Sequence, residues 1–281
     1  MTDPVRLITL RLAGLGLRLL SDIAPPLAGR CAAFIWFTPV RKAADACHAE
    51  WAAQSTVHVV NGLRLRSWGR PDGPHVVFVH GWGGRWDQGY ALICALVADG
   101  CRVSTLDFPG HGESPGLSTD VAAWIDALAA CDFGPAPVFV CHSFGFTAAA
   151  NAVLCRGVAA RGIVAINPPL GFPFFVEAFR RRARLSLTLV PHLVRAIERR
   201  VPQVRTLTAV PIEALSRHVP LLYIADRSDR EVPFLMHRVA METLGERFVT
   251  TEGLGHNRIL GSEPLRDLVR VFVAKIQPPG M

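Results

Sequence analysis

Short apolar runs alternate with longer helical stretches along the chain from about residue 56 onward. Apolar, β-branched runs separated by stretches of helical length predict a mostly parallel sheet with helices on both faces. The eight predicted strands are His58–Val60, Leu63–Trp68, Val76–His80, Arg102–Asp107, Val138–Cys141, Gly162–Asn167, Leu221–Ala225 and Arg247–Thr251. Asn61-Gly62 separates the first two. This dipeptide suits the positive φ angles of a hairpin turn, so the sheet should open with an antiparallel edge.

The predicted helices follow the strands in regular alternation. They are Asp87–Ala98, Thr119–Ala130, Phe144–Cys155, Pro233–Leu244 and Asn257–Lys275. The alternation is interrupted between Pro168 and His218, where the chain holds a cluster of phenylalanines and two proline breaks, Pro191 and Pro202. About fifty residues are too many for a simple connection, so this stretch is predicted to be a helical insertion.

The N-terminal stretch is strongly apolar over Val5–Leu20 and Leu27–Val40. Arginines interrupt it before it reaches the roughly 18 to 20 apolar residues that a membrane span requires, and they argue against a signal peptide. These arginines are Arg6, Arg11, Arg18, Arg30 and Arg41. At 100° per residue Arg11 and Arg18 share one helix face, with leucines over most of the rest. Packing on the catalytic domain or on a second subunit is favoured, and peripheral membrane contact stays open.

The 281 residues, 50% of them apolar, suffice for one well-buried catalytic domain. The predicted division is an N-terminal helical extension over 1–55, a catalytic domain over 56–167 and 219–281, and a helical cap over 168–218.

The formal net charge is +7, and almost all basic residues are arginines. Between Pro168 and His218 nine arginines face three glutamates. A net charge so localised gives little support for nucleic-acid binding, which we do not expect. The arginines of this segment are interpreted as a solvated surface in preference to a site for an anionic substrate.

The seven cysteines are odd in number and lack metal-ligand spacing. They resemble small buried residues of a reducing compartment, so we expect a cytoplasmic protein without a metal site.

Ser143 stands between the apolar run Val138-Phe139-Val140 and an uncharged helical stretch. This context predicts a nucleophile on a sharp strand-to-helix turn, where small residues are needed two positions before and after it. Gly145 meets this need, and Cys141 stands where glycine is usual. The amide of Phe144, at the start of the helix, is the first candidate oxyanion donor. The alternative is a serine that only caps the helix.

His80-Gly81-Trp82-Gly83-Gly84 directly follows a predicted strand. Its glycines let the backbone bend toward the reacting centre, so the amide of Trp82 is the second candidate oxyanion donor. The motif lacks the lysine and the serine or threonine of a phosphate-binding loop.

A carboxylate and an imidazole follow two later predicted strands, Asp229 after Leu221–Ala225 and His256 after the last strand. The order serine, aspartate, histidine is the one that acyl transfer on this architecture requires. Among ten histidines, His256 alone combines this chain order with a following helix. Asp226 is the fallback for the carboxylate.

Together these residues resemble the α/β-hydrolase superfamily from about Val57 to the C-terminus. The motifs that carry the resemblance are His80–Gly84, Asp107–Ser114, His142–Gly145, Asp229–Pro233 and Gly255–His256. The resemblance implies an eight-stranded sheet, a cap after the sixth strand and a cofactor-free pocket, as in bacterial members with an N-terminal helical segment. It favours Asp229, four residues before Pro233, as the acid. A serine nucleophile removes the dehalogenase and epoxide-hydrolase relatives, whose chemistry needs an aspartate.

The resulting hypothesis is a hydrolase that cleaves carboxylic esters through an acyl-enzyme and has an apolar acyl pocket. The predicted pocket residues are His80, Gly81, Phe146, Phe172, Phe174 and Phe175, beside Trp82 and Phe144. Acyl transfer or thioester cleavage on the same three residues is the first alternative, and a non-catalytic ligand-binding homologue is the second. Self-association through the N-terminal helix stays open.

Overall fold

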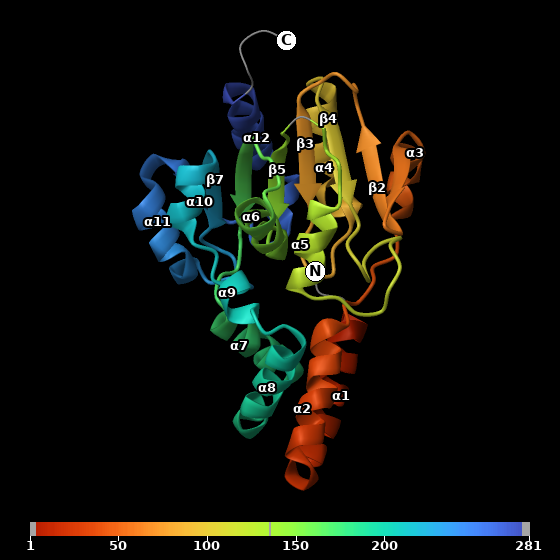
Figure 1. The fold of residues 1–281 in the computed structure, drawn as a ribbon, viewed down its shortest axis with the longest axis vertical. Helices are drawn as coiled ribbons and strands as arrows, with labels where there is room; N and C mark the ends of the chain where they lie inside the picture. The colour runs from red at the N-terminus through yellow and green to blue at the C-terminus, as the bar shows by residue number, and fades with distance from the viewer. Residues whose placement is uncertain (1–3, 135, 277–281) are drawn as a thin grey trace.

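An eight-stranded sheet forms the centre of the computed structural model, which describes residues 4–134 and 136–276, with the side chains of residues 4–8 and 11 left out (Figure 1). The strand order is β1-β2-β4-β3-β5-β6-β7-β8. The strands are β1 (Thr56–Val60), β2 (Leu63–Trp68), β3 (His75–Val79), β4 (Arg102–Leu106), β5 (Val138–His142), β6 (Gly162–Ile166), β7 (Leu221–Asp226) and β8 (Phe248–Thr251). The pairings from β4 through β8 are parallel, which confirms the predicted fold class.

The first two strands form the predicted antiparallel edge. Asn61 and Gly62 have φ angles of 49° and 81°, as a two-residue hairpin turn requires. The second strand also pairs antiparallel with β4, so the change to parallel pairing comes between β4 and β3. The side chains of β1 are mostly exposed, as expected at an edge.

Helices cover both faces of the sheet. They are α1 (Pro4–Ile23), α2 (Pro25–Phe37), α3 (Ala49–Ala53), α4 (Tyr90–Ala98), α5 (Val121–Ala129), α6 (Phe144–Arg156), α7 (Phe172–Ala183), α8 (Val190–Arg200), α9 (Val204–Thr208), α10 (Ile212–His218), α11 (Arg238–Leu244) and α12 (Glu263–Lys275). Successive residues of β5 alternate between the two faces: Val138 and Val140 pack in one buried cluster with α4 and α12, while Phe139 and Cys141 pack in the other with α5 and α6. The apolar strands therefore have two cores, one on each face.

Three predicted helices differ from the structure at their starts. The stretch predicted as one helix, Asn257–Lys275, is a 3₁₀ turn at Arg258–Gly261 followed by α12, and Ser262 between them is extended and caps α12.

The other two differences have the same form. The predicted helix Pro233–Leu244 begins as a 3₁₀ turn at Phe234–His237 before α11, and Asp87–Ala98 begins as a 3₁₀ turn at Trp86–Gly89 before α4. Tight 3₁₀ turns are frequent at helix N-termini, and apolar periodicity does not distinguish them from a first α-helical turn.

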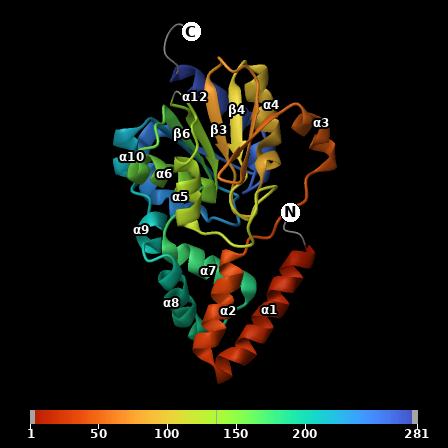
Figure 2. The ribbon, with the colours of Figure 1, turned by 45° about the vertical axis from the view of Figure 1, so that its right-hand side comes forward.

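Four helices form a lobe that projects beyond the sheet, which we call the helical lobe and define as α1, α2, α7 and α8 (Figures 1 and 2). Helix α1 packs against α7, and α2 packs against α8. Trp36 of α2 makes edge contacts with Phe172 and Phe179 of α7. The lobe belongs to the same buried cluster as α5 and α6. The division of the chain into extension, catalytic domain and cap stays a prediction. In the structure, α1 and α2 of the predicted extension contact α7 and α8 of the predicted cap.

We expect two glycines of α1 to respond oppositely to alanine. A Cβ at Gly14 would overlap the carbonyl of Ala183 in α7, whereas one at Gly16 would meet no described heavy atom within 4 Å. Gly14→Ala should lower the free energy of unfolding by about 1–3 kcal/mol through overpacking. Gly16→Ala should raise it by about 0.5–1 kcal/mol through helix propensity. Urea denaturation measures both, and equal effects would contradict the α1–α7 packing.

Candidate active site

Ser143 occupies a sharp turn between β5 and α6. Its φ and ψ angles are 52° and −125°, a backbone conformation that is costly for a residue with a Cβ. The turn is held because the Ser143 amide donates to the Ile166 carbonyl at 2.9 Å, and the Phe146 amide donates to the Ser143 carbonyl at 3.1 Å. The pairing of β5 with β6 therefore stabilises the strained residue.

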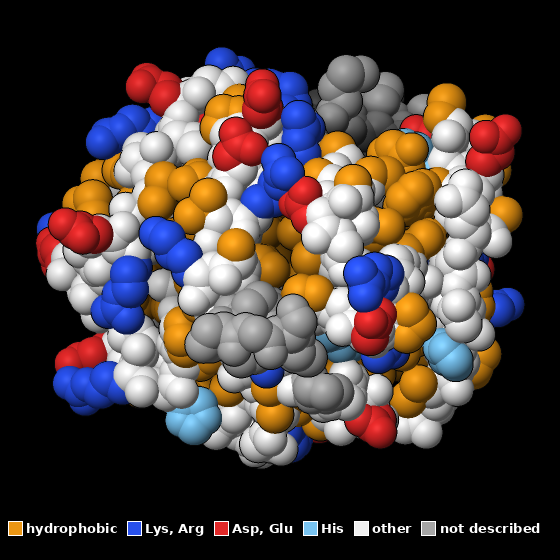
Figure 3. Space-filling view, turned by 90° about the horizontal axis from the view of Figure 1, so that it is seen from above, with side chains coloured by type: hydrophobic (Ala, Val, Ile, Leu, Met, Phe, Trp, Pro, Cys, Tyr) orange, Lys and Arg blue, Asp and Glu red, His pale blue; other side chains and the backbone are white. Residues whose placement is uncertain are grey.

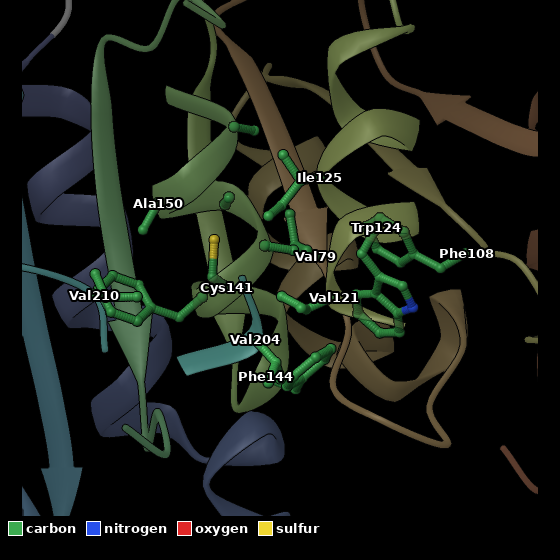
Figure 4. Packing of buried hydrophobic residues seen from close by; sticks show 14 of the residues in the cluster. Val79, Phe108, Val121, Trp124, Ile125, Cys141, Phe144, Ala150, Val204 and Val210 are labelled. Carbon is green, nitrogen blue, oxygen red and sulfur yellow. The ribbon is translucent and has the colours of Figure 1, made fainter. Parts of the chain in front are cut away.

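The residues two positions on either side of Ser143 are tightly enclosed. A Cβ at Gly145 would lie 2.5 Å from the Val79 carbonyl oxygen and 2.6 Å from that of His80, so the position has no room for a side chain. Cys141 is fully buried beneath α6 in the cluster shown in Figure 4. The small thiol fits where the sequence departs from glycine.

The three residues expected to act together form one hydrogen-bonded chain. Nε2 of His256 lies 3.0 Å from Oγ of Ser143, and its Nδ1 lies 2.7 Å from Oδ2 of Asp229. The carboxylate accepts only, so Nδ1 carries the ring proton and Nε2 is left to accept the serine proton. The Asp229 side chain is fully buried. Its other oxygen accepts the amides of Glu231 and Val232 at 2.7 and 2.9 Å, which fixes its orientation.

Asp226, the fallback for the acid, is hydrogen-bonded elsewhere. It accepts the amides of Gly255 at 2.9 Å and Leu254 at 3.2 Å, and the Thr251 hydroxyl at 2.8 Å. Burial raises the pKa of Asp226, but these hydrogen bonds outweigh burial and leave the pKa below its usual value. Asp226 thus ties the loop before His256 to the end of β7.

Two further residues that sequence reasoning did not assign also hold this loop. His142 Nε2 lies 2.9 Å from the His256 carbonyl oxygen and donates to it. Asn167 donates to the Gly255 carbonyl at 3.3 Å and accepts the Asp226 amide at 2.8 Å. From the sequence, the position of His142 beside Ser143 shows only that its ring points away from the serine side chain. Nothing in the local sequence singles out Asn167.

The glycine-rich loop after β3 passes directly beside Ser143. A Cβ at Gly81 would lie 3.1 Å from the Cβ of Ser143, so glycine permits this approach. The Gly81 amide donates to Gln88 at 3.0 Å, and the Gly83 amide donates to His111 at 2.9 Å. The Trp82 amide between them donates to no acceptor within the described part of the chain.

The other candidate oxyanion donor is the amide of Phe144. This residue opens α6, and the first amides of a helix have no acceptor within it. The amides of Trp82 and Phe144 thus border the serine from two different segments.

A chain of polar side chains crosses the loops around the site. Gln88 donates to Asn257 at 3.4 Å, Asn257 donates to Glu231 at 3.1 Å, and Arg182 of α7 donates to Glu231 at 3.0 Å. Gln88 also accepts the Gly81 amide. The chain links the helical lobe to the loops that carry Asp229 and His256.

The predicted pocket residues divide into two groups. Phe175 makes an edge contact with Phe144 at a centroid distance of 5.6 Å and with Phe174 at 5.9 Å. Trp82, which is 37% exposed, contacts Phe144 at 5.4 Å. These rings form an aromatic wall from three segments of the chain. Phe172 is buried against Trp36 of the lobe.

The other two predicted pocket side chains lie beneath the surface. Phe146 is fully buried against Tyr223, and His80 is fully buried with Nδ1 2.8 Å from the Gly81 carbonyl oxygen. Neither has exposed surface for a substrate to contact. Below Trp82 the rings of Phe108 and Trp124 stack at 3.9 Å, and Figure 4 shows both in the cluster that contains Phe144. Because its ring contacts the Gly81 carbonyl, the buried His80 supports the glycine-rich loop after β3.

Comparison with known proteins identifies the family. The family model described as "Alpha/beta hydrolase family" matches residues 76–271. The chain belongs to the alpha/beta hydrolase family. This alpha/beta hydrolase is 26% identical over 232 residues to an uncharacterized protein of Mycobacterium tuberculosis, a match that covers 78% of each chain.

Two further matches are more distant or shorter. Pimeloyl-[acyl-carrier protein] methyl ester esterase of Methylococcus capsulatus is 37% identical over 119 residues, which is 41% of this alpha/beta hydrolase and 43% of that enzyme. The structure of an esterase from Pyrococcus furiosus has a TM-score of 0.62 at 17% identity, covering 85% of this chain and 97% of that chain. At this identity the likeness concerns the fold.

The described residues contain neither a candidate metal site nor a candidate membrane-spanning helix. No group of three or more His, Cys, Asp or Glu side chains there could hold a metal ion. No helix in the described ranges is long and apolar enough to cross a membrane.

We expect the stability of this alpha/beta hydrolase to fall as the pH drops from 6.5 toward 4. Burial lowers the pKa of His80 and His237 to about 4 and that of His111 to about 3, so the unfolded chain takes up their protons first. Each such proton contributes a slope of about 1.4 kcal/mol per pH unit in this window. Burial raises the pKa of Asp107, which acts in the opposite direction but is a single group.

Urea midpoints between pH 7 and pH 5 measure this slope. His237→Asn should make the slope of the free energy of unfolding against pH shallower, by at most the contribution of one proton. The same change at the exposed His218 serves as the control. A free energy of unfolding that stays constant over this range would contradict the prediction.

Proposed function

We propose that this protein hydrolyses carboxylic esters through an acyl-enzyme formed on Ser143. The observation that carries the proposal is the unbroken chain of hydrogen bonds from Ser143 through His256 to the buried Asp229. A serine hydroxyl is a weak nucleophile alone, and a neighbouring imidazole held in the correct tautomer makes it reactive.

In the proposed reaction Oγ of Ser143 attacks the ester carbonyl carbon while Nε2 of His256 takes the serine proton. The tetrahedral intermediate collapses when the carbon–oxygen bond to the alcohol breaks, and the imidazolium gives its proton to that oxygen. Water then attacks the acyl-enzyme with His256 as base, which releases the acid and restores Ser143. Asp229 stabilises the imidazolium in both halves of the reaction.

The negative charge of each tetrahedral intermediate is assigned to the amides of Trp82 and Phe144. Each such donor contributes about 2.7–4 kcal/mol to transition-state stabilisation in serine hydrolases. The hydrogen bonds of Gly81 with Gln88 and of Gly83 with His111 support this role, because they fix the peptides on either side of Trp82.

The aromatic wall of Trp82, Phe144 and Phe175 favours an apolar acyl group. The partial match to an enzyme named as a methyl ester esterase is consistent with an ester substrate.

Replacement of the nucleophile is the direct test. Ser143→Ala should lower kcat on p-nitrophenyl butyrate by roughly 10⁴-fold or more and abolish labelling by a fluorophosphonate probe. Ser216→Ala on α10 is the matched control and should keep both. Full activity in Ser143→Ala would reject the proposal, and unlabelled wild-type protein would favour a non-catalytic homologue. Diversion of the acyl group to added alcohol or thiol at the expense of water would favour acyl transfer.

Asp226, the last residue of β7, and Asp229, which follows the strand, should respond differently to replacement by asparagine. Asp229→Asn should lower kcat by about 10⁴-fold with stability largely kept, because the amide disturbs the imidazole tautomer. Asp226→Asn should mainly lower the urea midpoint, because it weakens the hydrogen bonds to Gly255 and Thr251. The reverse pattern, measured by kinetics and denaturation on both variants, would move the acid role to Asp226.

A further inference from the structure

Helix α1 carries apolar side chains on two opposite faces. Leu17 is buried on the face that packs on the rest of the protein, where the polar Ser21 is buried as well. Leu12, Leu15, Leu19 and Ile23 are 64%, 56%, 64% and 84% exposed. Their spacing places them along one stripe of the helix. This stripe has no partner among the described residues.

Other exposed apolar residues lie on the same helical lobe. Leu27 and Phe34 of α2 are 49% and 67% exposed, and Leu187, in the turn between α7 and α8, is 72% exposed. That turn packs against both α1 and α2. Figure 2 shows α1 and α2 side by side at the end of the molecule away from the sheet. We call the exposed apolar residues of α1 and α2, together with Leu187, the lobe face.

The helical lobe also holds positive charge that no acidic side chain neutralises. Arg30, Arg184, Arg195 and Arg199 are exposed, and within the described part of the chain none has an ion-pair partner. Arg18 donates to a backbone carbonyl of the α7–α8 connection at 2.6 Å, which leaves its charge unpaired. The end opposite the lobe differs, since Figure 3 shows basic and acidic side chains interspersed there.

We propose that the lobe face docks peripherally on a membrane surface rich in anionic phospholipid. Leucine, isoleucine and phenylalanine side chains would enter the boundary between headgroups and acyl chains, and the arginines would pair with lipid phosphates. Each arginine near an anionic surface contributes about 1 kcal/mol to binding. In this proposal the lobe face lies in the plane of the interface.

A second copy of the chain is the alternative occupant of the lobe face. In a two-fold dimer through this face the unpaired arginines of both copies would come together. Asp22 is the only acidic residue of α1 and α2, so little would offset that repulsion. The charge of the lobe thus favours an anionic partner over self-association.

Vesicle co-sedimentation tests the proposal on full-length Ser143→Ala protein, so the result does not depend on the proposed function. Binding should be strong to phosphatidylcholine vesicles containing phosphatidylglycerol and weak to phosphatidylcholine alone. Leu15→Asp with Leu19→Asp should reduce binding about tenfold or more. Leu235→Asp with Val239→Asp is the matched control, because these residues are 84% and 63% exposed on another surface, and it should bind normally.

Two further measurements test the contribution of the arginines to binding and the folding of the leucine variants. Arg30→Gln and Arg195→Gln should each weaken binding to anionic vesicles about fivefold, with a steep dependence on salt. In the wild-type background, unchanged hydrolysis of a soluble short-chain ester by the leucine variants would show that they fold. Equal binding to both vesicle types, equal loss in the control pair, or a dimer that the leucine variants dissociate without any vesicle binding would overturn the proposal.

Discussion

The strained backbone at Ser143 is the constraint on which the site depends. A residue with a Cβ at φ 52° is stable only where the surroundings hold it, and here β5–β6 pairing and the first turn of α6 do so. The close approach of α6 to β3 follows from this turn and leaves no room for a side chain at Gly145. The pairing of β5 with β6 therefore also fixes the position of the serine hydroxyl.

The loop before His256 is held by groups that do not face the serine. Asp226, His142 and Asn167 each hydrogen-bond its backbone, from the ends of three neighbouring strands. Parallel strands bring their carboxyl ends to one edge of the sheet, which is why residues far apart in sequence meet there. All three side chains are buried, and their hydrogen bonds fix the backbone at His256 so that its imidazole is held facing Ser143.

The helical lobe joins the N-terminal helices to the segment after β6. Its inner side packs against the same core as α5 and α6, and Arg182 connects it to the polar chain around the site. Its outer side carries the lobe face. One group of helices thus borders the aromatic wall and presents the surface proposed for docking.

The sheet, its antiparallel edge and the order of the motifs could be predicted from the residues alone, because apolar periodicity and turn chemistry are local properties of the chain. Contacts between distant segments could not be predicted in this way. Folding distinguishes Asp229 from Asp226 by their hydrogen bonds, buries Phe146 and His80, and brings α1 and α2 onto α7 and α8. These outcomes depend on packing and on polar pairing between residues far apart in sequence, and no local pattern encodes them.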